Sequence, residues 1–398
     1  MLVLTEERPK VMSTSDVHDV LIVGAGPAGA WTAYRLASSG MRVMLVDGSH
    51  PREKPCGGGV TGRALSMVQA AIPQRSLGSV RIGGATFTHD DRTVHVPLSG
   101  DDSGYPPLVV AGRREFDGAL LSAAVAAGAE WKRSRVAGIA RQNGGWEVET
   151  RDGRYSARWL IGADGVNSLV RRRLSTPFPR DALSIATGYF VKNRSSQEIV
   201  VAFEDDPPGY LWSFPRPDHL AVGMCAQADE TTAPALQQLA ARWIADHVGP
   251  NETLERYSWP IPSLDEAALT REHPAGPGWM LVGDAAGLVD PITREGIYFA
   301  LQSAELAAES LVVRRGDPAR RYVDRIRSDI HAELIRAARL KAHFFQPRFI
   351  SLLVTALCRS SRIRTIMADL VAGRQSYQAL RGRLLKTFEW KLMLELFG

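Results

Sequence analysis

A strand, a glycine-rich turn and a helix follow one another near the beginning of the sequence, and they constrain the fold more than any other segment. The segment reads HDVLIVGAGPAGAWTAYRLASSGMRVMLVDG. Its first apolar run is short and ends in glycine, as a buried parallel strand does, and an alanine-rich stretch with helical spacing then continues to Gly40. Because RVMLVD predicts a second strand, the order is β-α-β, the unit of parallel sheets with helices on their faces.

The turn inside this unit, GAGPAG at residues 24–29, fits the pattern G-x-G-x-x-G. Gly24 permits the tight turn, Gly26 lets the backbone approach a pyrophosphate at the helix N-terminus, and Gly29 lets the helix and strand pack closely. Asp47 ends the second strand 18 residues after Gly29, where its carboxylate can accept hydrogen bonds from an adenosine ribose. A glycine-rich turn alone is often only structural, but the complete unit predicts a dinucleotide site, for NAD or FAD.

The composition is that of an ordinary globular protein. Of the 398 residues, 45% are hydrophobic and 23% are charged, which is enough chain for two or three domains. The three cysteines, at positions 56, 225 and 358, do not have the spacing of metal ligands. We therefore predict no metal site, and the odd, low count favours a reducing, cytoplasmic location over a disulfide framework. Residues 1–17 contain no apolar run of signal-peptide length and are expected to be a disordered leader.

The charge of the chain is unevenly distributed. Residues 311–398 contain 18 Lys and Arg against 7 Asp and Glu, whereas the whole chain has a formal net charge of only +5. A basic helical region with apolar stripes can contact anionic lipid, a phosphorylated ligand or nucleic acid, or it can simply be a solvated helix surface. Its longest apolar run, FISLLVTALC, has ten residues and is too short to span a bilayer, so we expect at most peripheral contact with a membrane surface.

The remaining segments predict the domain organisation. After a glycine-rich loop, KPCGGGVTGRAL, alternating runs at residues 80–110 predict antiparallel, substrate-side strands, and REFDGALLSAAVAAGAE predicts a helix. Three short strands joined by Asn-Gly and Asp-Gly turns come next, then a fourth that ends in GADG. We expect an α/β fold (α+β overall) with a Rossmann-like dinucleotide-binding domain, a β-rich substrate-domain insert and a helical C-terminal region. The expected bounds are 18–174 and 263–312 for the first domain, 175–262 for the insert and 313–398 for the helical region.

Two later motifs separate FAD from NAD. GADGVNS at residues 162–168 and VGDAAGLVDPITREGI at residues 282–297 resemble the second and third fingerprints of flavoproteins related to p-hydroxybenzoate hydroxylase. In GDAAG the carboxylate of Asp284 can bond the ribityl chain, and the helix that opens at EGI can favour negative charge at its N-terminus. RREFD resembles the R-x-x-F-D motif of the same superfamily, which implies that Arg113 lies near the FAD pyrophosphate. By itself, Arg113 is more typical of a surface arginine; together with the other motifs it indicates the FAD site.

The stretch PPGYLWSFPRP, from Pro207 to Pro217, narrows the resemblance. It matches P-x-x-Y-x-W-x-F-P, a pattern that resembles the geranylgeranyl reductase family, and KPCGGG and the helical C-terminal region also resemble that family. In a strand, Tyr210, Trp212 and Phe214 point to one face, where they can form an aromatic wall for a long apolar ligand or belong to the core of the β-rich insert. The flanking prolines favour the wall, because they end ladder pairing.

The family resemblance implies the ligands and the residues that hold them. It implies FAD, a hydrophobic prenyl-type substrate and a transient electron donor, either NAD(P)H or a reduced carrier protein, with no nucleic-acid partner. The substrate is expected to contact the three aromatic residues of the wall. The residues expected to bind FAD are Gly24, Gly26, Ala28, Gly29, Asp47, Cys56, Gly57, Gly58, Gly59, Arg113, Val136, Asp164, Gly165, Gly283, Asp284, Gly296 and Ile297.

The expected activity is the reduction of carbon–carbon double bonds in an isoprenoid lipid or quinone side chain. Reduced flavin gives a hydride to one alkene carbon, and a proton goes to the other. Cys56 is a candidate proton donor because the CGGG loop can approach the flavin and a thiol with a pKa of about 8.5 is protonated at neutral pH; it can also be a packed residue or a simple flavin contact. Tyr210 can donate through its phenol or, as we favour, only line the channel. His219 is more typical of a turn residue than of an acid.

Two alternative functions remain. A flavin-dependent monooxygenase or halogenase acting on an aromatic or polyketide substrate would share the FAD residues. Halogenases of this superfamily have the motif W-x-W-x-I-P, whereas this chain has Tyr210 in place of the first tryptophan and Phe214 in place of isoleucine, which counts against halogenation. A non-enzymatic flavin-binding or membrane-docking protein is the third class, and turnover of bound FAD would separate it from the other two.

Overall fold

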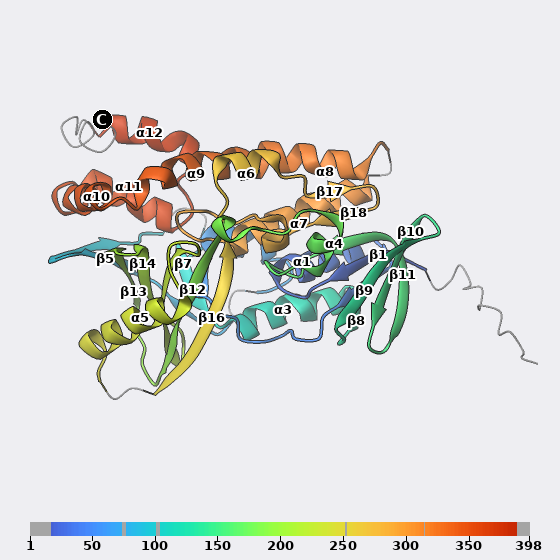
Figure 1. Ribbon diagram of the computed structural model, residues 1–398, viewed down its shortest axis with the longest axis horizontal. Helices are drawn as coiled ribbons and strands as arrows, with labels where there is room; N and C mark the ends of the chain where they lie inside the picture. Colours follow the sequence, from blue (N-terminus) through green and yellow to red (C-terminus); the bar gives the residue numbers. More distant parts are fainter. Residues whose placement is uncertain (1–16, 74–76, 101–103, 251–252, 314, 388–398) are drawn as a thin grey trace, which may run out of the picture.

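The computed structural model describes residues 17–73, 77–100, 104–250, 253–313 and 315–387. Two large sheets lie side by side, and most of the C-terminal helices lie along one side of both (Figure 1). The predicted leader lies outside the described residues except for Val17, which already belongs to the first strand. Residues 388–398 of the predicted helical region also lie outside them.

The first large sheet contains the β-α-β unit predicted at the start of the chain. Its strands run in the order β17-β18-β11-β1-β2-β8; β10 also pairs with β11, and β9 pairs with β10. The strands from β18 to β8 pair in parallel, and all of β2 and the second half of β1 are buried, as expected for strands with helices over them. The bounds are β1 (Val17–Val23), β2 (Val43–Val46), β8 (Glu130–Lys132), β9 (Val136–Gln142), β10 (Gly145–Thr150), β11 (Gly153–Gly162), β17 (Ala275–Gly276) and β18 (Trp279–Leu281).

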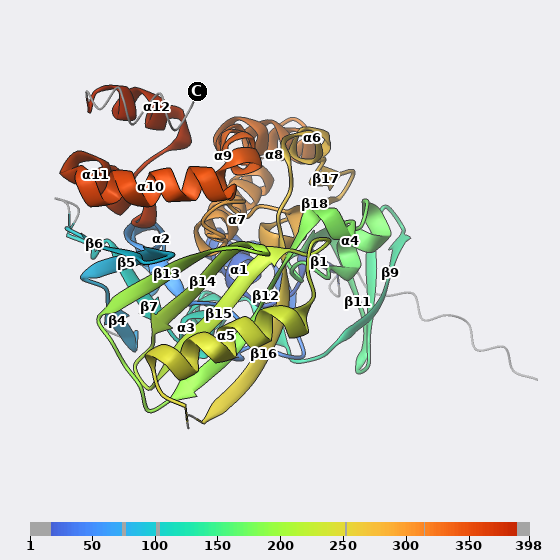
Figure 2. The same cartoon turned by 60° about the vertical axis from the view of Figure 1, so that its left-hand side comes forward.

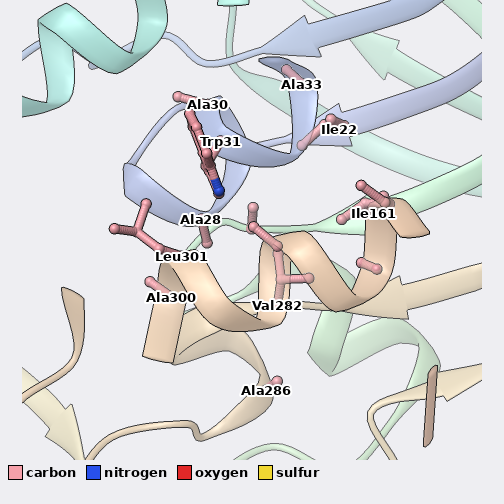
Figure 3. Close-up of a cluster of buried hydrophobic side chains, with 14 of the residues drawn as sticks. Ile22, Ala28, Ala30, Trp31, Ala33, Ile161, Val282, Ala286, Ala300 and Leu301 are labelled. Carbon is pink, nitrogen blue, oxygen red and sulfur yellow. The ribbon is translucent and has the colours of Figure 1, made fainter. Parts of the chain in front are cut away.

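Three helices pack together beside this sheet. Helix α1 (Pro27–Ser38) contacts both α3 (Arg113–Ala126) and α7 (Ile297–Val312). Small side chains let α1 and α7 approach closely, and the wholly buried Trp31 fills the space beside them, as Figure 3 shows together with Ala28 and Ala300. Because α1 begins at the glycine turn and α7 begins at the EGI motif, this packing brings two of the predicted FAD fingerprints together.

The second large sheet has seven strands in the order β16-β12-β15-β14-β13-β5-β6. Neighbouring strands are antiparallel except β13 and β5, which pair in parallel. Helix α5 (Ala233–His247) covers one face of this sheet (Figure 2). The bounds are β5 (Gly84–His89), β6 (Arg92–Pro97), β12 (Leu183–Lys192), β13 (Glu198–Asp205), β14 (Pro208–Pro215), β15 (His219–Gln227) and β16 (Leu254–Pro262).

The C-terminal helices join the two sheets. Helices α10 and α11 pack on β5 and β6 at one edge of the seven-stranded sheet, whereas α8 packs on α7 of the first domain (Figure 2). None of the described helices is long and apolar enough to cross a membrane. The bounds are α6 (Glu266–Arg271), α8 (Pro318–Ile326), α9 (Ala332–Phe344), α10 (Pro347–Arg359), α11 (Ser361–Val371) and α12 (Tyr377–Leu385); a short helix α2 (Gly62–Val68) and α4 (Leu169–Leu174) lie earlier in the chain.

The predicted fold class is confirmed, and three details differ from expectation. Residues 80–110 divide between two sheets. Strands β5 and β6 extend the seven-stranded sheet, whereas β7 (Leu108–Ala111) lies between β3 (Gly59–Thr61) and β4 (Ser79–Arg81) in a separate three-stranded sheet. The third and fourth strands expected before GADG form one strand, β11, since no turn residue interrupts the segment after Gly153. The β-rich insert also contains α5. The domain bounds themselves stay a prediction.

Candidate active site

A cavity of about 1260 Å³ lies between the two large sheets, and its wall contains nearly all the residues expected to bind FAD or substrate. This volume exceeds the roughly 300–1,000 Å³ of a pocket for one drug-sized ligand, so a dinucleotide and a second ligand fit together. The predicted residues on the wall are Gly24, Gly26, Ala28, Asp47, Cys56, Gly57, Gly58, Gly59, Arg113, Val136, Asp164, Gly165, Tyr210, Trp212, Phe214, Asp284, Gly296 and Ile297. Gly29 and Gly283 are not on the wall; each packs against backbone or side chains behind it.

The glycine turn is tightly packed on one side and open on the other. A Cβ atom at Gly24, whose φ is +103°, would lie 2.3 Å from the carbonyl oxygen of Ala163, and one at Gly29 would lie 1.8 Å from the carbonyl oxygen of Gly24. At Gly26 the nearest atom would be His50 Nε2, at 3.6 Å. The N-terminus of α1 is therefore open to the cavity, where its free amides can bind a pyrophosphate.

A buried polar network holds Asp47 at the end of β2. Its carboxylate accepts hydrogen bonds from the Ala25 amide (2.8 Å) and from His50 Nδ1 (2.8 Å). Burial alone would raise the pKa of Asp47, but the hydrogen bond and charge of His50 outweigh burial and hold this pKa below its usual range. The other ring nitrogen of His50 lies 3.5 Å from Asp117, so the imidazole links two carboxylates. Asp47 thus stays ionised beside the start of α1, as an acceptor for ribose hydroxyls should.

Arg113 begins α3 with its side chain buried, which excludes the surface-arginine alternative. Its guanidinium donates to both carboxylate oxygens of Asp117, at 2.9 and 2.8 Å. The same guanidinium also interacts with the Cys56 thiol. Arg113 is therefore on the cavity wall with its charge already paired, and its contact with a pyrophosphate stays a prediction.

The two later fingerprints each place a carboxylate on the cavity wall. Asp164 accepts hydrogen bonds from Ser168 Oγ (2.5 Å) and the Leu169 amide (2.6 Å), so it caps the start of α4, and burial raises its pKa. Asp284 forms an ion pair with Lys54 Nζ at 3.0 Å. Asp164 therefore has a structural role besides its predicted contact with FAD, whereas Asp284 is held by one flexible lysine.

The loop of residues 57–59 passes close to the aromatic wall. A Cβ atom would lie 2.8 Å from the Phe214 ring at Gly57 and 3.2 Å from it at Gly59. Gly58 has a φ of +83°, a backbone conformation that favours glycine. Any larger residue would push the loop away from Phe214. The three glycines therefore bring Cys56 and the loop backbone up to the aromatic wall.

The aromatic wall on β14 is both a buried strand face and part of the cavity lining. Leu211 and its neighbours on β15 face α5, whereas Tyr210, Trp212 and Phe214 face the cavity. Trp212 is only 6% exposed and lies over Gly223, where a Cβ atom would be 2.3 Å from its indole ring. The two readings of the stretch are therefore compatible, since the strand is central in its sheet and its rings fill the space beside the cavity.

The phenol of Tyr210 is held by the loop that precedes α7. Its hydroxyl donates to the carbonyl oxygen of Thr293 at 3.1 Å. Burial is the main cause that raises the pKa of Tyr210 well above its usual value, and the nearby Cys225 thiol adds to the shift. A phenol so placed is a poor acid at neutral pH. This geometry favours a lining role for Tyr210 over proton donation.

Arg216 and Glu53 form a charged pair behind the cavity wall that was not identified from the sequence. Arg216, which directly follows the aromatic motif, is fully buried; it forms an ion pair with Glu53 and donates to the carbonyl oxygen of Cys56 at 2.5 Å. Glu53 also accepts from the Arg113 amide at 3.1 Å. Together they tie the cysteine loop to both β14 and α3. The sequence feature that could have identified Arg216 is its position between Pro215 and Pro217, at the end of the aromatic motif.

The cavity also has an apolar arm that was not predicted from the sequence. Its residues come from segments far apart in the chain, on β5, β13 and the helices α9 and α11. They include Phe87, Val201, Phe203, Phe344, Met367 and Leu370. These side chains continue the surface of the aromatic wall, because Phe203 and Tyr210 are paired across β13 and β14.

His219 is not among the residues that line the cavity. It begins β15, where its Nδ1 lies 2.7 Å from Asp218 and its ring packs edge-on against Phe190 with centroids 5.0 Å apart. Burial lowers its pKa. The structure therefore favours a turn residue over an acid, as the sequence did.

Comparison with protein families gives a match over most of the chain. Residues 17–332 match the family model described as FAD binding domain. A menaquinone reductase from Mycolicibacterium smegmatis is 30% identical, with 87% of this chain and 90% of that protein covered. A digeranylgeranylglycerophospholipid reductase from Methanothrix thermoacetophila is also 30% identical, with 82% of this chain and 88% of that protein covered.

Solved structures share the fold at lower identity. A geranylgeranyl bacteriochlorophyll reductase-like protein from Thermoplasma acidophilum has a TM-score of 0.77 at 22% identity, with 93% of this chain and 99% of that chain covered. A flavin-dependent brominase has a TM-score of 0.66 at 19% identity, with 94% and 99% covered. The fold is thus shared by reductase-like and halogenating flavoproteins, and the activity has to be argued from the site.

Proposed function

The chain belongs to the FAD-binding domain family and, within it, to the geranylgeranyl reductase family of FAD-dependent oxidoreductases, and we propose that it saturates carbon–carbon double bonds of an isoprenoid lipid or quinone side chain. One observation carries this proposal. The aromatic wall on β14 lies against the cysteine loop, and the apolar arm continues it within the same cavity that holds the FAD fingerprints. A long apolar chain can therefore reach a flavin without crossing water.

The residues of the first domain fit FAD. The open space beside the Cα atom of Gly26 can hold a pyrophosphate at the N-terminus of α1, and the ionised Asp47 can accept hydrogen bonds from the adenosine ribose. Asp284 suits the ribityl chain, and the N-terminus of α7 at Gly296 suits the electron-rich edge of the ring system. When bound and reduced, FAD would supply a hydride for addition to an alkene.

The protein would contribute orientation, exclusion of water and a proton. An isolated alkene accepts a hydride poorly, so protonation has to lead or accompany the transfer, and a dry channel prevents competing reactions. Cys56 is the proposed proton donor, since its loop reaches the aromatic wall and the cavity. Tyr210, Trp212 and Phe214 would hold the substrate chain against this loop.

The electron donor to FAD is proposed to dock transiently, as NAD(P)H or as a reduced carrier protein. The described part of the chain has one glycine-rich dinucleotide turn, which the FAD site uses. The named relatives differ in substrate, since one is a menaquinone reductase and another a phospholipid reductase. The choice between a lipid and a quinone side chain for this protein is therefore part of the proposal.

We further propose that the basic C-terminal helices contact the membrane surface from which a lipid-like substrate enters. Arg348, Arg359 and Arg381 are exposed on α10 and α12, whereas Arg383 is engaged in an ion pair with Asp369 at 2.6 Å. Near anionic lipid each exposed basic residue can contribute about 1 kcal/mol, an attraction that salt screens. Wild type should pellet with anionic vesicles at low salt, and Arg381→Glu should reduce the pelleted fraction. Equal recovery with neutral and anionic vesicles would contradict the contact.

The experiment that tests the proposed reaction is product analysis under nitrogen. Holoenzyme reduced with dithionite is mixed with a geranylgeranyl lipid or with menaquinone, and the masses of the products are measured by mass spectrometry. The proposal expects products whose prenyl chain, as distinct from a quinone ring, is heavier by one H₂ for each saturated bond, without added oxygen. The alternative, a flavin-dependent monooxygenase or halogenase, would give no product until oxygen is admitted, and a monooxygenase product would then be heavier by one oxygen atom.

A further inference from the structure

Two basic side chains, Arg294 and Lys341, lie together beside the cavity, and neither forms an ion pair with a carboxylate of the described residues. Arg294 is on the cavity wall, and its guanidinium donates to Ser263 Oγ. Lys341 Nζ donates to the same Ser263 Oγ at 2.7 Å and to Gln227 Oε1 at 2.8 Å. Within the described ranges, the hydrogen bonds of both side chains therefore go to uncharged groups, which are oxygen atoms of Ser263 and Gln227 and, for Arg294, also the Cys225 thiol. The two side chains therefore share one serine, and no carboxylate in the part of the chain that the structure describes pairs with either of them.

The surroundings make this arrangement unfavourable without a ligand. Burial lowers the pKa of Lys341 to about 7, and the charge of Arg294 adds to the shift; Asp229 and Glu230 oppose it without forming an ion pair. Nε of Arg294 is buried and has no hydrogen-bond partner among the described residues. Buried charges in proteins are normally paired or bound to a ligand. An anion at this place would neutralise both side chains and accept hydrogen bonds from them.

The backbone at Arg294 supports a role for its side chain. Its φ is +60°, in the left-handed region that favours glycine. The turn is held from both sides, because Asp290 Oδ1 accepts from the amides of Ile292 and Thr293, and Tyr210 donates to the Thr293 carbonyl oxygen. Strained residues of this kind are kept mainly where the side chain is needed. The fixed loop therefore presents a guanidinium where glycine would be the relaxed choice.

The cation pair lies next to the surface proposed for the prenyl chain. Lys341 and Phe344 are one turn apart on α9, and Phe344 belongs to the apolar arm. Arg294 also affects the pKa values of Tyr210 and Cys225, both of which are on the cavity wall. A ligand with an anionic head at Arg294 can thus extend its chain over the phenylalanines of the arm.

We propose that Arg294 and Lys341 form an oxyanion subsite that binds the phosphate of a phosphorylated prenyl substrate while its chain lies in the apolar arm. The inference rests on the proposed function, because it takes a prenyl chain as the occupant of the arm. The planar guanidinium of Arg294 matches two phosphate oxygens, and Lys341 adds a point charge that the anion keeps protonated. A neutral head group would leave the guanidinium uncompensated and would not favour the protonated form of Lys341.

The test compares two ligands with the same chain, geranylgeranyl phosphate and geranylgeraniol, on the oxidised holoenzyme. Binding is followed by the fluorescence of the cavity tryptophans, Trp212 and Trp259. We expect wild type to bind the phosphate at least about tenfold more tightly than the alcohol. Arg294→Gly removes the guanidinium and relaxes the backbone, so it should fold and lose this preference. Lys341→Met should weaken the preference as a second, independent variant.

Arg339→Gln is the matched control. Arg339 lies on α9 two residues before Lys341, is exposed, and pairs with Glu266 at 2.6 Å. This variant should keep the wild-type preference. Inorganic phosphate should compete with geranylgeranyl phosphate in wild type and should lose this effect in Arg294→Gly, which would show that the head group alone is recognised.

Equal affinity of wild type for phosphate and alcohol, or an unchanged preference in both variants, would overturn the subsite. Failure of the proposed function looks different. In that case wild type prefers the phosphate and the preference depends on Arg294, but reduced holoenzyme saturates neither ligand. Such a result would support the subsite and contradict the reductase function.

Discussion

The two sides of the cavity are built by different physical means. On the side of the first domain, backbone geometry and buried charges define the wall. The glycine turn has no space for a Cβ atom at Gly24 or Gly29, and a chain of buried polar groups joins Asp47, His50, Asp117 and Arg113. On the side of the seven-stranded sheet, apolar rings from distant elements define it. A site of the first kind tolerates almost no change in shape, whereas a site of the second kind can accept related chains of different length.

This contrast predicts that changes on the two sides have separable effects. Changes in the first domain should alter FAD binding, and changes on the sheet should alter turnover with FAD still bound. The predictions below test that separation, beginning with the largest expected effect.

Gly29→Val should abolish FAD binding. The added side chain would meet the carbonyl oxygen of Gly24, 1.8 Å from the new Cβ, and neither backbone segment can move without breaking the turn. Purified protein should lack flavin absorbance even after incubation with excess FAD. Gly83→Ala is the control, because a Cβ atom there meets nothing within 4 Å. A variant at Gly29 with wild-type flavin content would break the account of the first domain.

Cys56→Ala should slow alkene reduction by about 100-fold in a single turnover, because general acids typically contribute about 10²–10⁴. Its FAD content should stay at the wild-type level. The measurement is the rate of product formation after mixing pre-reduced enzyme with substrate. Tyr210→Phe is the matched control, since the phenol is hydrogen-bonded to the Thr293 carbonyl oxygen and is proposed only to line the channel. If Tyr210→Phe decreases the single-turnover rate more than Cys56→Ala does, Tyr210 is the proton donor and Cys56 is not.

Trp212→Ala should reduce turnover by about tenfold and lower the free energy of unfolding by about 3–5 kcal/mol, because a buried indole is replaced by a cavity. Below its melting temperature the variant should retain FAD, since Trp212 belongs to the sheet side. Flavin content and steady-state rate are measured on the same sample. Trp212→Phe should recover most of the stability. Loss of FAD from folded Trp212→Ala would mean that the two sides are not separable.

His50→Gln should change how stability depends on pH, and this is the smallest of the effects. Burial would lower the pKa of His50, but hydrogen bonds to Asp117 and Asp47 and their charges raise it above its ordinary value of 6.5. The contribution of protonated His50 is therefore complete below that value and is lost as pH rises through the folded pKa.

The stability difference between wild type and His50→Gln should thus be greater at about pH 5.5 than at about pH 9. Thermal unfolding of the two proteins at both values measures it. The guanidinium of Arg113 also faces this network, since it pairs with Asp117 and stays charged over the whole range. A difference that grows with pH would show that His50 is neutral in the folded protein.

The first domain could be predicted from the sequence because its constraints are local. The β-α-β unit, the glycine turn and Asp47 lie within about thirty residues, and each follows from steric rules for one backbone segment. The Asn-Gly turn between β9 and β10 was predicted for the same reason, and Asn143 and Gly144 both have positive φ.

The rest of the site could not be predicted because it depends on contacts between distant segments. Phe87 and Phe344 carry no local signal that would place them in one cavity, and they meet only because α10 and α11 pack on β5 and β6. Arg294 likewise lies in a motif that predicts FAD binding. Its proximity to Lys341 on α9, where both side chains donate to Ser263, depends on tertiary packing. The alternation of Tyr210, Trp212 and Phe214 predicted that the three rings share one face of the strand. It did not predict that this face would both belong to a buried core and line the cavity.

The most direct test of the central claim is the anaerobic reoxidation of bound flavin. Reduced holoenzyme is mixed with a prenyl substrate in the absence of oxygen, and the absorbance of oxidised flavin is followed. The account predicts that the absorbance returns with one saturated bond formed per flavin, and that Trp212→Ala slows this return while its flavin content is unchanged. Flavin that stays reduced with every prenyl substrate and reoxidises only when oxygen is admitted would contradict the account.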